Sequence, residues 1–188
     1  MFIQTETTPN PATLKFMPGR PVLKEGTLDL RDAGAAARSP LAERLFAIQG
    51  VGGVFFGQDF ITVTKTAGEW AHLKPVILGA IMEYFLSGEP IVRPDAAGTN
   101  RNDQADEFFE EKDAGTVATI KELIETRVRP AVANDGGDIT FRGYRDGIVY
   151  LDMKGSCAGC PSSTATLKNG IENLLRHFVP DVVEVRPV

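Results

Sequence analysis

Residues 135–161 of the chain read DGGDITFRGYRDGIVYLDMKGSCAGCP, and this stretch decides how the second half of the chain folds. Runs rich in β-branched and aromatic residues at 139–141 and 148–153 predict two strands, and turn residues at 145–147 join them as a hairpin. The glycines at 136 and 137 predict that a helix ends just before the hairpin.

The end of this stretch holds the two cysteines of the chain, Cys157 and Cys160. Their Cys-x-x-Cys spacing lets the two sulfurs bind one ligand. The small residues Gly155 and Gly159 allow the backbone around the cysteines to turn tightly. Pro161 suits the first turn of a helix, and apolar residues at helical spacing follow it. Because a helix N-terminus carries partial positive charge, we expect it to favour the thiolate over the thiol.

Two thiolates are too few for a closed metal site, since structural zinc and iron–sulfur clusters usually take about four ligands. The two histidines, His72 and His177, stand at no metal-ligand spacing from the cysteines. The simplest complete ligand set therefore comes from two chains, each contributing Cys157 and Cys160. The spacing does not distinguish zinc from an iron–sulfur cluster.

Two other interpretations of the cysteine pair stay open from the residues alone. Free cysteines are often small buried hydrophobic residues, although isolated cysteines on apolar faces fit that description better than a pair in a glycine-flanked loop. A thioredoxin-like redox dithiol is the stronger rival, and it would follow a buried strand in a βαβ pattern. Here the preceding strand ends a hairpin, which argues against the redox interpretation.

The composition limits the class of protein. The 188 residues suit one large domain or two small ones, and a net charge of −5 without a Lys/Arg cluster argues against nucleic-acid binding. No apolar run is long enough to span a membrane, and the first residues resemble neither a signal peptide nor an Arg- and Ser-rich leader. Two cysteines at this spacing fit a reducing compartment. We therefore expect a cytoplasmic bacterial protein, or an organelle-matrix protein after removal of a leader.

The chain is predicted to form two small α+β domains joined by an acidic flexible linker: 1–88, 89–114 as linker, and 115–188. In the first half, the patterns predict strands at 2–6, 13–16, 27–30, 51–56 and 60–65, and helices after Ser39-Pro40 and from Trp70 to Leu86. The second half should follow the order α-β-β-loop-α-β, with its last strand at 182–185. Phe108 and Phe109 are unusual for a linker, and we expect them to dock on a domain rather than on a partner.

Several short motifs resemble a known family. In the first half they are residues 2–5 (FIQT), 8–11 (TPNP) and 14–16 (LKF). In the second half they are Arg129-Pro130, residues 135–138 (DGGD) and residues 155–163 (GSCAGCPSS). The first half resembles the Nfu N-terminal domain and the second the NifU C-terminal (Nfu) domain, in the order and at the separation typical of that family.

The resemblance implies an iron–sulfur cluster scaffold or carrier that has no enzymatic turnover. Members of this family hold a 4Fe-4S cluster between two subunits, so the implied ligands are Cys157 and Cys160 of each chain. The implied partners are a second copy, recipient apo iron–sulfur proteins and upstream cluster assembly proteins. It also suggests that the turn at 135–138 lies beside the cluster, besides linking a helix to a strand. A dithiol-disulfide oxidoreductase is the alternative, and the first domain, without a ligand set, is expected to help select partners.

Overall fold

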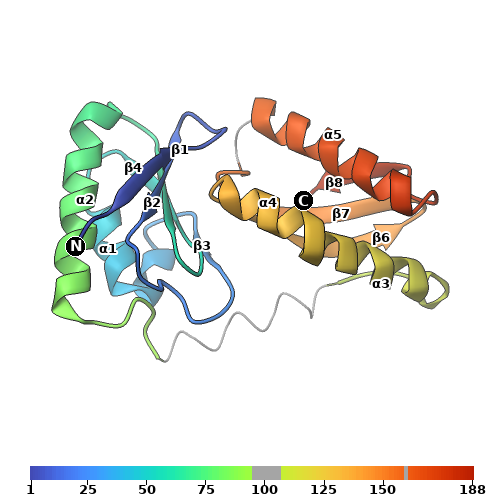
Figure 1. Ribbon diagram of the computed structural model, residues 1–188, viewed down its shortest axis with the longest axis horizontal. Helices are drawn as coiled ribbons and strands as arrows, with labels where there is room; N and C mark the ends of the chain where they lie inside the picture. Colours follow the sequence, from blue (N-terminus) through green and yellow to red (C-terminus); the bar gives the residue numbers. More distant parts are fainter. Residues whose placement is uncertain (95–106, 159–160) are drawn as a thin grey trace. The chain divides into compact units, whose positions relative to one another are not determined.

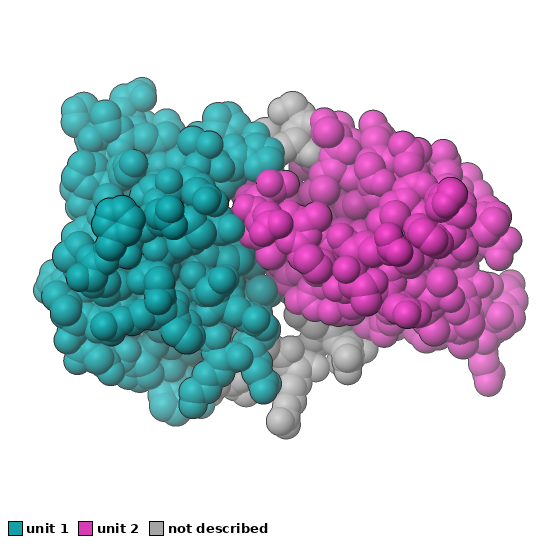
Figure 2. Space-filling view, viewed as in Figure 1, with its two compact units in different colours: residues 1–100 teal, residues 101–188 magenta. Residues whose placement is uncertain are grey.

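The computed structural model describes residues 1–94, 107–158 and 161–188, with no account of the side chains of 161–163. The chain divides into two compact units, Met1–Asn100 and Arg101–Val188 (Figures 1 and 2). Each unit combines helices with a sheet, so the predicted α+β class is confirmed. The division falls within the predicted linker at 89–114, whose bounds remain a prediction because its central residues, 95–106, lie outside the described residues.

The first unit is a five-stranded antiparallel sheet with the order β1-β2-β5-β4-β3. Its strands are β1 (Gln4–Thr7), β2 (Thr13–Met17), β3 (Leu28–Leu30), β4 (Val51–Phe56) and β5 (Ile61–Lys65). The helices α1 (Pro40–Phe46) and α2 (Trp70–Ser87) pack against this sheet around one apolar core (Figure 1).

Local sequence signals place the helices of the first unit as predicted. The Ser39 hydroxyl accepts a hydrogen bond from Ala42 N–H in the first turn of α1. Pro40 begins this helix, at a position where a backbone N–H would have no partner within the helix. Gly88 ends α2 in the left-handed conformation, with φ of 73°. At the other end of α2, the Trp70 indole donates to the Pro11 carbonyl at 3.0 Å, so Trp70 serves packing at the helix start.

The second unit is a three-stranded sheet with the order β6-β7-β8. β6 (Gly137–Arg145) and β7 (Ile148–Gly155) form the predicted hairpin, and β8 (Glu184–Pro187) runs parallel to β7. The helices are α3 (Ala114–Leu123), α4 (Arg129–Asn134) and α5 (Pro161–Phe178). β8 begins two residues later than expected, because a turn at 179–182 follows α5.

The parallel pairing of β7 and β8 changes one argument made from the sequence. β7 lies between its two neighbours in the sheet, and α5 connects it to β8, so β7, α5 and β8 form a βαβ crossover. The segment between β7 and α5, residues 156–160, is called the cysteine loop, and it therefore does follow a central strand in a βαβ unit. The sequence pattern of the hairpin shows only the antiparallel pairing of β7 with β6, and it does not exclude a parallel pairing of β7 with β8 on its other side.

Pro130 neither ends nor shortens the first helix of this unit. A π-helical segment, Ile124–Val128, joins α3 to α4, and Pro130 lies in the first turn of α4. Proline cannot donate a backbone hydrogen bond, and its ring crowds the preceding helical turn. The wider π-helical turn before Pro130 makes room for the ring, so the helix can continue to Asn134. From the sequence, Pro130 would be expected to kink or shorten the end of this helix; the structure has a π-helical segment before it, and the chain stays helical to Asn134.

Phe108 docks on the second unit, as expected, and adds a short bridge to the free edge of β6. Its backbone N–H donates to the Arg142 carbonyl at 3.0 Å, and its carbonyl accepts from Tyr144 N–H at 2.9 Å. The ring lies over Gly143, where any side chain would collide with it, and 5.1 Å from the Tyr150 ring. Phe108 is still 38% exposed in this position, and the neighbouring Phe109 is 42% exposed.

The core of the second unit is formed by buried apolar residues from its helices and from all three strands, and it includes Cys157. Among the described residues, no helix is both long enough and apolar enough to cross a membrane.

Candidate functional site

The cysteine loop lies between the end of β7 and the start of α5 (Figure 1). Gly155 ends β7 with φ of 66°, a left-handed conformation that favours glycine. Ala158 N–H donates to the Gly155 carbonyl at 3.1 Å, which closes a tight turn around Cys157. Cys160 lies outside the described residues, so the structure places only Cys157 of the predicted pair.

Cys157 points inward and is only 5% exposed. The residues on both sides of it are anchored. The Ser156 hydroxyl donates to the Asp135 carbonyl at 2.5 Å, and Ser156 N–H donates to the Gly136 carbonyl at 3.2 Å. On the α5 side, the Thr164 hydroxyl donates to the Cys157 carbonyl at 3.1 Å. These bonds tie the loop to the 135–137 turn and to α5.

The turn between α4 and β6 forms the wall against which Cys157 packs. Gly136 adopts φ of 81°, as a helix-ending glycine should. A Cβ placed on Gly137 would lie 2.5 Å from Cys157 Sγ and 2.8 Å from the Lys154 carbonyl oxygen, so only glycine fits there without movement. The prediction that this segment is a helix-to-strand turn is confirmed, and the turn touches the cysteine.

The expectation that the helix N-terminus would hold Cys157 as a thiolate is wrong for this conformation. The pKa of the Cys157 thiol is raised from 9.0 to about 12, mainly because the thiol is buried. The hydrogen bond to Ser156 lowers the pKa against this effect, and the nearby carboxylates of Asp135 and Asp138 each raise it by a smaller amount. The residue therefore remains protonated at neutral pH. Sequence could place the loop before a helix, but it could not show that the sulfur turns into the core.

An ion pair behind the turn was not predicted. The Arg129 guanidinium donates through Nε and Nη2 to the two carboxylate oxygens of Asp138, at 2.8 and 2.9 Å, and through Nη1 to Glu125 at 2.6 Å. These bonds raise the pKa of Arg129 above its usual value. Asp138 also accepts from Ile139 N–H at 2.9 Å. The pair therefore joins the start of α4 to the start of β6, on which the turn depends.

Within the described part of the chain, no group of three or more His, Cys, Asp or Glu side chains could hold a metal ion. His177 lies edge-on to the Phe178 ring, with centroids 4.9 Å apart. His72 lies in the first turn of α2 in the other unit. The described residues of one chain thus supply one inward-facing sulfur and no alternative ligand cluster.

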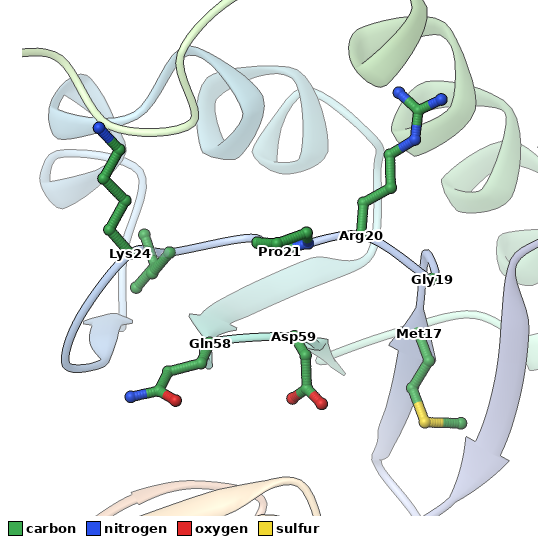
Figure 3. Close-up of a pocket in the computed structure, with 8 residues that line it drawn as sticks. Met17, Gly19, Arg20, Pro21, Lys24, Gln58 and Asp59 are labelled. Atoms are coloured by element: carbon green, nitrogen blue, oxygen red, sulfur yellow. The ribbon is translucent and has the colours of Figure 1, made fainter.

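The first unit carries an open hollow of about 590 Å³ beside the loop that follows β2. Figure 3 shows that Arg20 and Lys24 extend to one side of this loop, while Met17, Gln58 and Asp59 extend to the other. Since these polar groups do not converge on a common point, the hollow has none of the geometry of a catalytic site.

Two family models match the chain. The first, described as scaffold protein Nfu/NifU N terminal, matches residues 3–88, and the second, described as NifU-like domain, matches residues 120–186. Their order and positions agree with the two units of the structure and with the motifs identified in the sequence.

Comparison with curated proteins finds relatives named as iron–sulfur cluster scaffold homologs or as NifU-like proteins. The chain is 52% identical over 190 residues to a human protein named NFU1 iron-sulfur cluster scaffold homolog, mitochondrial, covering 100% of this chain and 72% of that protein. It is 50% identical over 190 residues to the protein of the same name from Drosophila virilis, covering 100% of this chain and 62% of that protein. It is 50% identical over 185 residues to NifU-like protein 4, mitochondrial, of Arabidopsis thaliana, covering 97% of this chain and 64% of that protein.

Comparison with solved structures finds a solution NMR structure of a NifU-like protein from Saccharomyces cerevisiae. The two are 27% identical with a TM-score of 0.45, and the match covers 50% of this chain and 85% of that one.

Proposed function

The chain belongs to the Nfu/NifU family of iron–sulfur cluster scaffold proteins, and from that premise we propose that two copies hold one 4Fe-4S cluster between them and deliver it to recipient apoproteins. The observation that supports this proposal is that the sequence has both of its cysteines between Gly155, where β7 ends, and Pro161, where α5 begins. Cys157 and Cys160 of each chain would be the ligands, giving the usual four thiolates.

Sharing the cluster between two chains suits a carrier. A cluster held by two thiolates on each side can leave when the chains separate, whereas one enclosed by a single chain is retained by the fold. The cluster is therefore cargo, and no turnover is required. The partners would be a second copy, upstream cluster assembly proteins and apo iron–sulfur proteins, with the first unit helping to choose among recipients.

The names of the relatives support a compartment for this chemistry. The relatives reported above are named as mitochondrial, so an organelle matrix is the proposed location, with a bacterial cytoplasm as the other candidate. Both compartments keep thiols reduced.

A dithiol-disulfide oxidoreductase remains the second candidate, because the βαβ crossover places the Cys-x-x-Cys loop where such a dithiol is found. Burial raises the pKa of Cys157 in the conformation described, so this thiol would have to turn outward to act either as an attacking thiolate or as a cluster ligand.

Anaerobic reconstitution with iron and sulfide tests the proposal. We expect colourless, mainly monomeric apoprotein to become a brown dimer with about one four-iron cluster per two chains. Size exclusion with iron and sulfide assays measures both quantities. A stable cluster on a monomer would contradict the shared site, and dithiol turnover without any cluster uptake would favour the oxidoreductase.

A further inference from the structure

The inward position of Cys157 poses a question that the proposed function leaves open. With 5% exposure and its sulfur packed against Gly137, this thiol belongs to the core of the second unit. A cluster shared with another chain has to contact the sulfur directly. The conformation described here is therefore one from which Cys157 must turn outward before it can ligate.

Two hydroxyl groups hold the backbone on either side of this thiol. Ser156, itself only 2% exposed, donates through its side chain to the Asp135 carbonyl at 2.5 Å. Thr164, in the first turns of α5, donates to the carbonyl of Cys157 itself at 3.1 Å. One bond anchors the loop to the turn before β6, and the other anchors it to the helix that follows. Together they fix the peptide units on both sides of Cys157, and with them the direction of its Cα–Cβ bond, from which the sulfur reaches the place beside Gly137.

We propose that Ser156 and Thr164 are positioning residues that hold Cys157 in a retracted position in the empty protein and release it when the cluster is loaded. The inference rests on the proposed function, because the outward state is the one that ligates. The glycine at 137 makes the retracted position possible, since a side chain there would occupy the place of the sulfur. The two hydroxyls then set how often the thiol leaves that place.

The test uses the full-length apoprotein with Cys160→Ser, so that Cys157 is the single thiol. Iodoacetamide labels it in the absence of iron and sulfide, and intact-mass spectrometry follows the rate. We expect Cys157 to react much more slowly in the native protein than in urea-unfolded protein. Ser156→Ala and Thr164→Val should each accelerate native labelling about fivefold, the ratio that corresponds to one lost hydrogen bond.

Two controls separate this role from general destabilisation. Thr164→Ser keeps the hydroxyl and should label like the parent. Thr119→Val removes a comparable hydroxyl, which donates to the Gly115 carbonyl at 3.2 Å in α3, and should also label like the parent. If a variant unfolds more readily, labelling at several urea concentrations distinguishes local opening, which depends weakly on urea, from global unfolding, which depends on it steeply.

Native labelling as fast as in the unfolded protein would overturn the retracted position. Unchanged rates in Ser156→Ala and Thr164→Val, or acceleration that follows global unfolding alone, would overturn the positioning role. Because no iron or sulfide is present, these results are independent of reconstitution. If the wild type takes up no cluster but its variants label faster, the proposed function fails and the positioning role stands.

Discussion

Replacing Gly137 with alanine should destabilise the second unit and displace Cys157. The Cβ would lie 2.5 Å from Cys157 Sγ and 2.8 Å from the Lys154 carbonyl oxygen, both well inside the roughly 3.5 Å of ordinary non-bonded contact. The sulfur can rotate away, but the carbonyl belongs to β7, which pairs with β6 along its length. The backbone must therefore shift, and overpacking of this kind costs about 1–3 kcal/mol.

Gly170 provides a matched control in the same unit. It lies in α5, and in the described part of the chain nothing is within 4 Å of a Cβ placed there. Gly170→Ala should therefore stabilise the unit by about 0.5–1 kcal/mol, because alanine loses less backbone entropy in a helix.

Hydrogen exchange of the amides in β6 and β7, read by mass spectrometry on the full chain, reports this unit separately from the other. For a loss of about 2 kcal/mol, the most protected amides should exchange about thirtyfold faster in Gly137→Ala. Cys157 should also be alkylated faster in this variant. Equal exchange in Gly137→Ala and the parent would show that the turn does not pack tightly against the cysteine, and the steric reasoning would be wrong.

Three further predictions follow from the same residues. Cys157→Ser and Cys160→Ser should each abolish stable cluster binding while leaving the circular dichroism spectrum near that of wild type, since serine offers a hard, protonated oxygen in place of a soft thiolate; a full cluster on either variant would remove that cysteine from the ligand set. Folding raises the pKa of Cys157 from 9.0 to about 12, so the protonated thiol stabilises the folded apoprotein fully below pH 9, and this stabilisation should be lost as the pH rises toward 12. Urea titrations across that pH range should therefore show a smaller decrease in the free energy of unfolding for Cys157→Ala than for the wild type. A fragment of residues 107–188 should fold alone and bind a cluster with a second copy. It should be more stable than a fragment of residues 113–188 by about 1–3 kcal/mol, because the shorter fragment lacks Phe108 on the edge of β6. Equal urea midpoints for the two fragments would contradict this expectation.

The sequence predicted the elements whose signals are local. Ser39-Pro40 and Gly88 mark helix ends by their own side-chain and backbone chemistry, and the structure confirms both. The hairpin turn is equally local, since Asp146 and Gly147 adopt the positive φ values, 51° and 79°, that two-residue hairpin turns require. In each case a short segment contains the whole physical reason.

The elements that sequence reasoning missed depend on contacts between distant segments. The bridge of Phe108 to β6 forms because Gly143, 35 residues later by sequence number, leaves room for the ring. The parallel pairing of β8 with β7 needs the completed packing of α5. The ion pair of Arg129 with Asp138 depends on how the turn after α4 directs β6 back along the helix. None of these has a signal within one short window.

The candidate site depends on both kinds of signal, and this explains why the sequence predicts a ligand pair but not the burial of Cys157. Spacing and small neighbours identify a two-sulfur loop, yet the direction of Cys157 is set by Gly137 across the turn. In a carrier, that direction has a consequence for delivery. When the cluster leaves, Cys157 can return to the core, and the hydrogen bonds of Ser156 and Thr164 can form again. The empty protein then has a lower free energy than it would have with Cys157 exposed. Retraction therefore weakens the hold on the cluster and favours its transfer, so variants that release Cys157 should retain a loaded cluster longer and deliver it more slowly to an apoprotein. Faster delivery by those variants would mean that retraction serves only to shield the empty thiol.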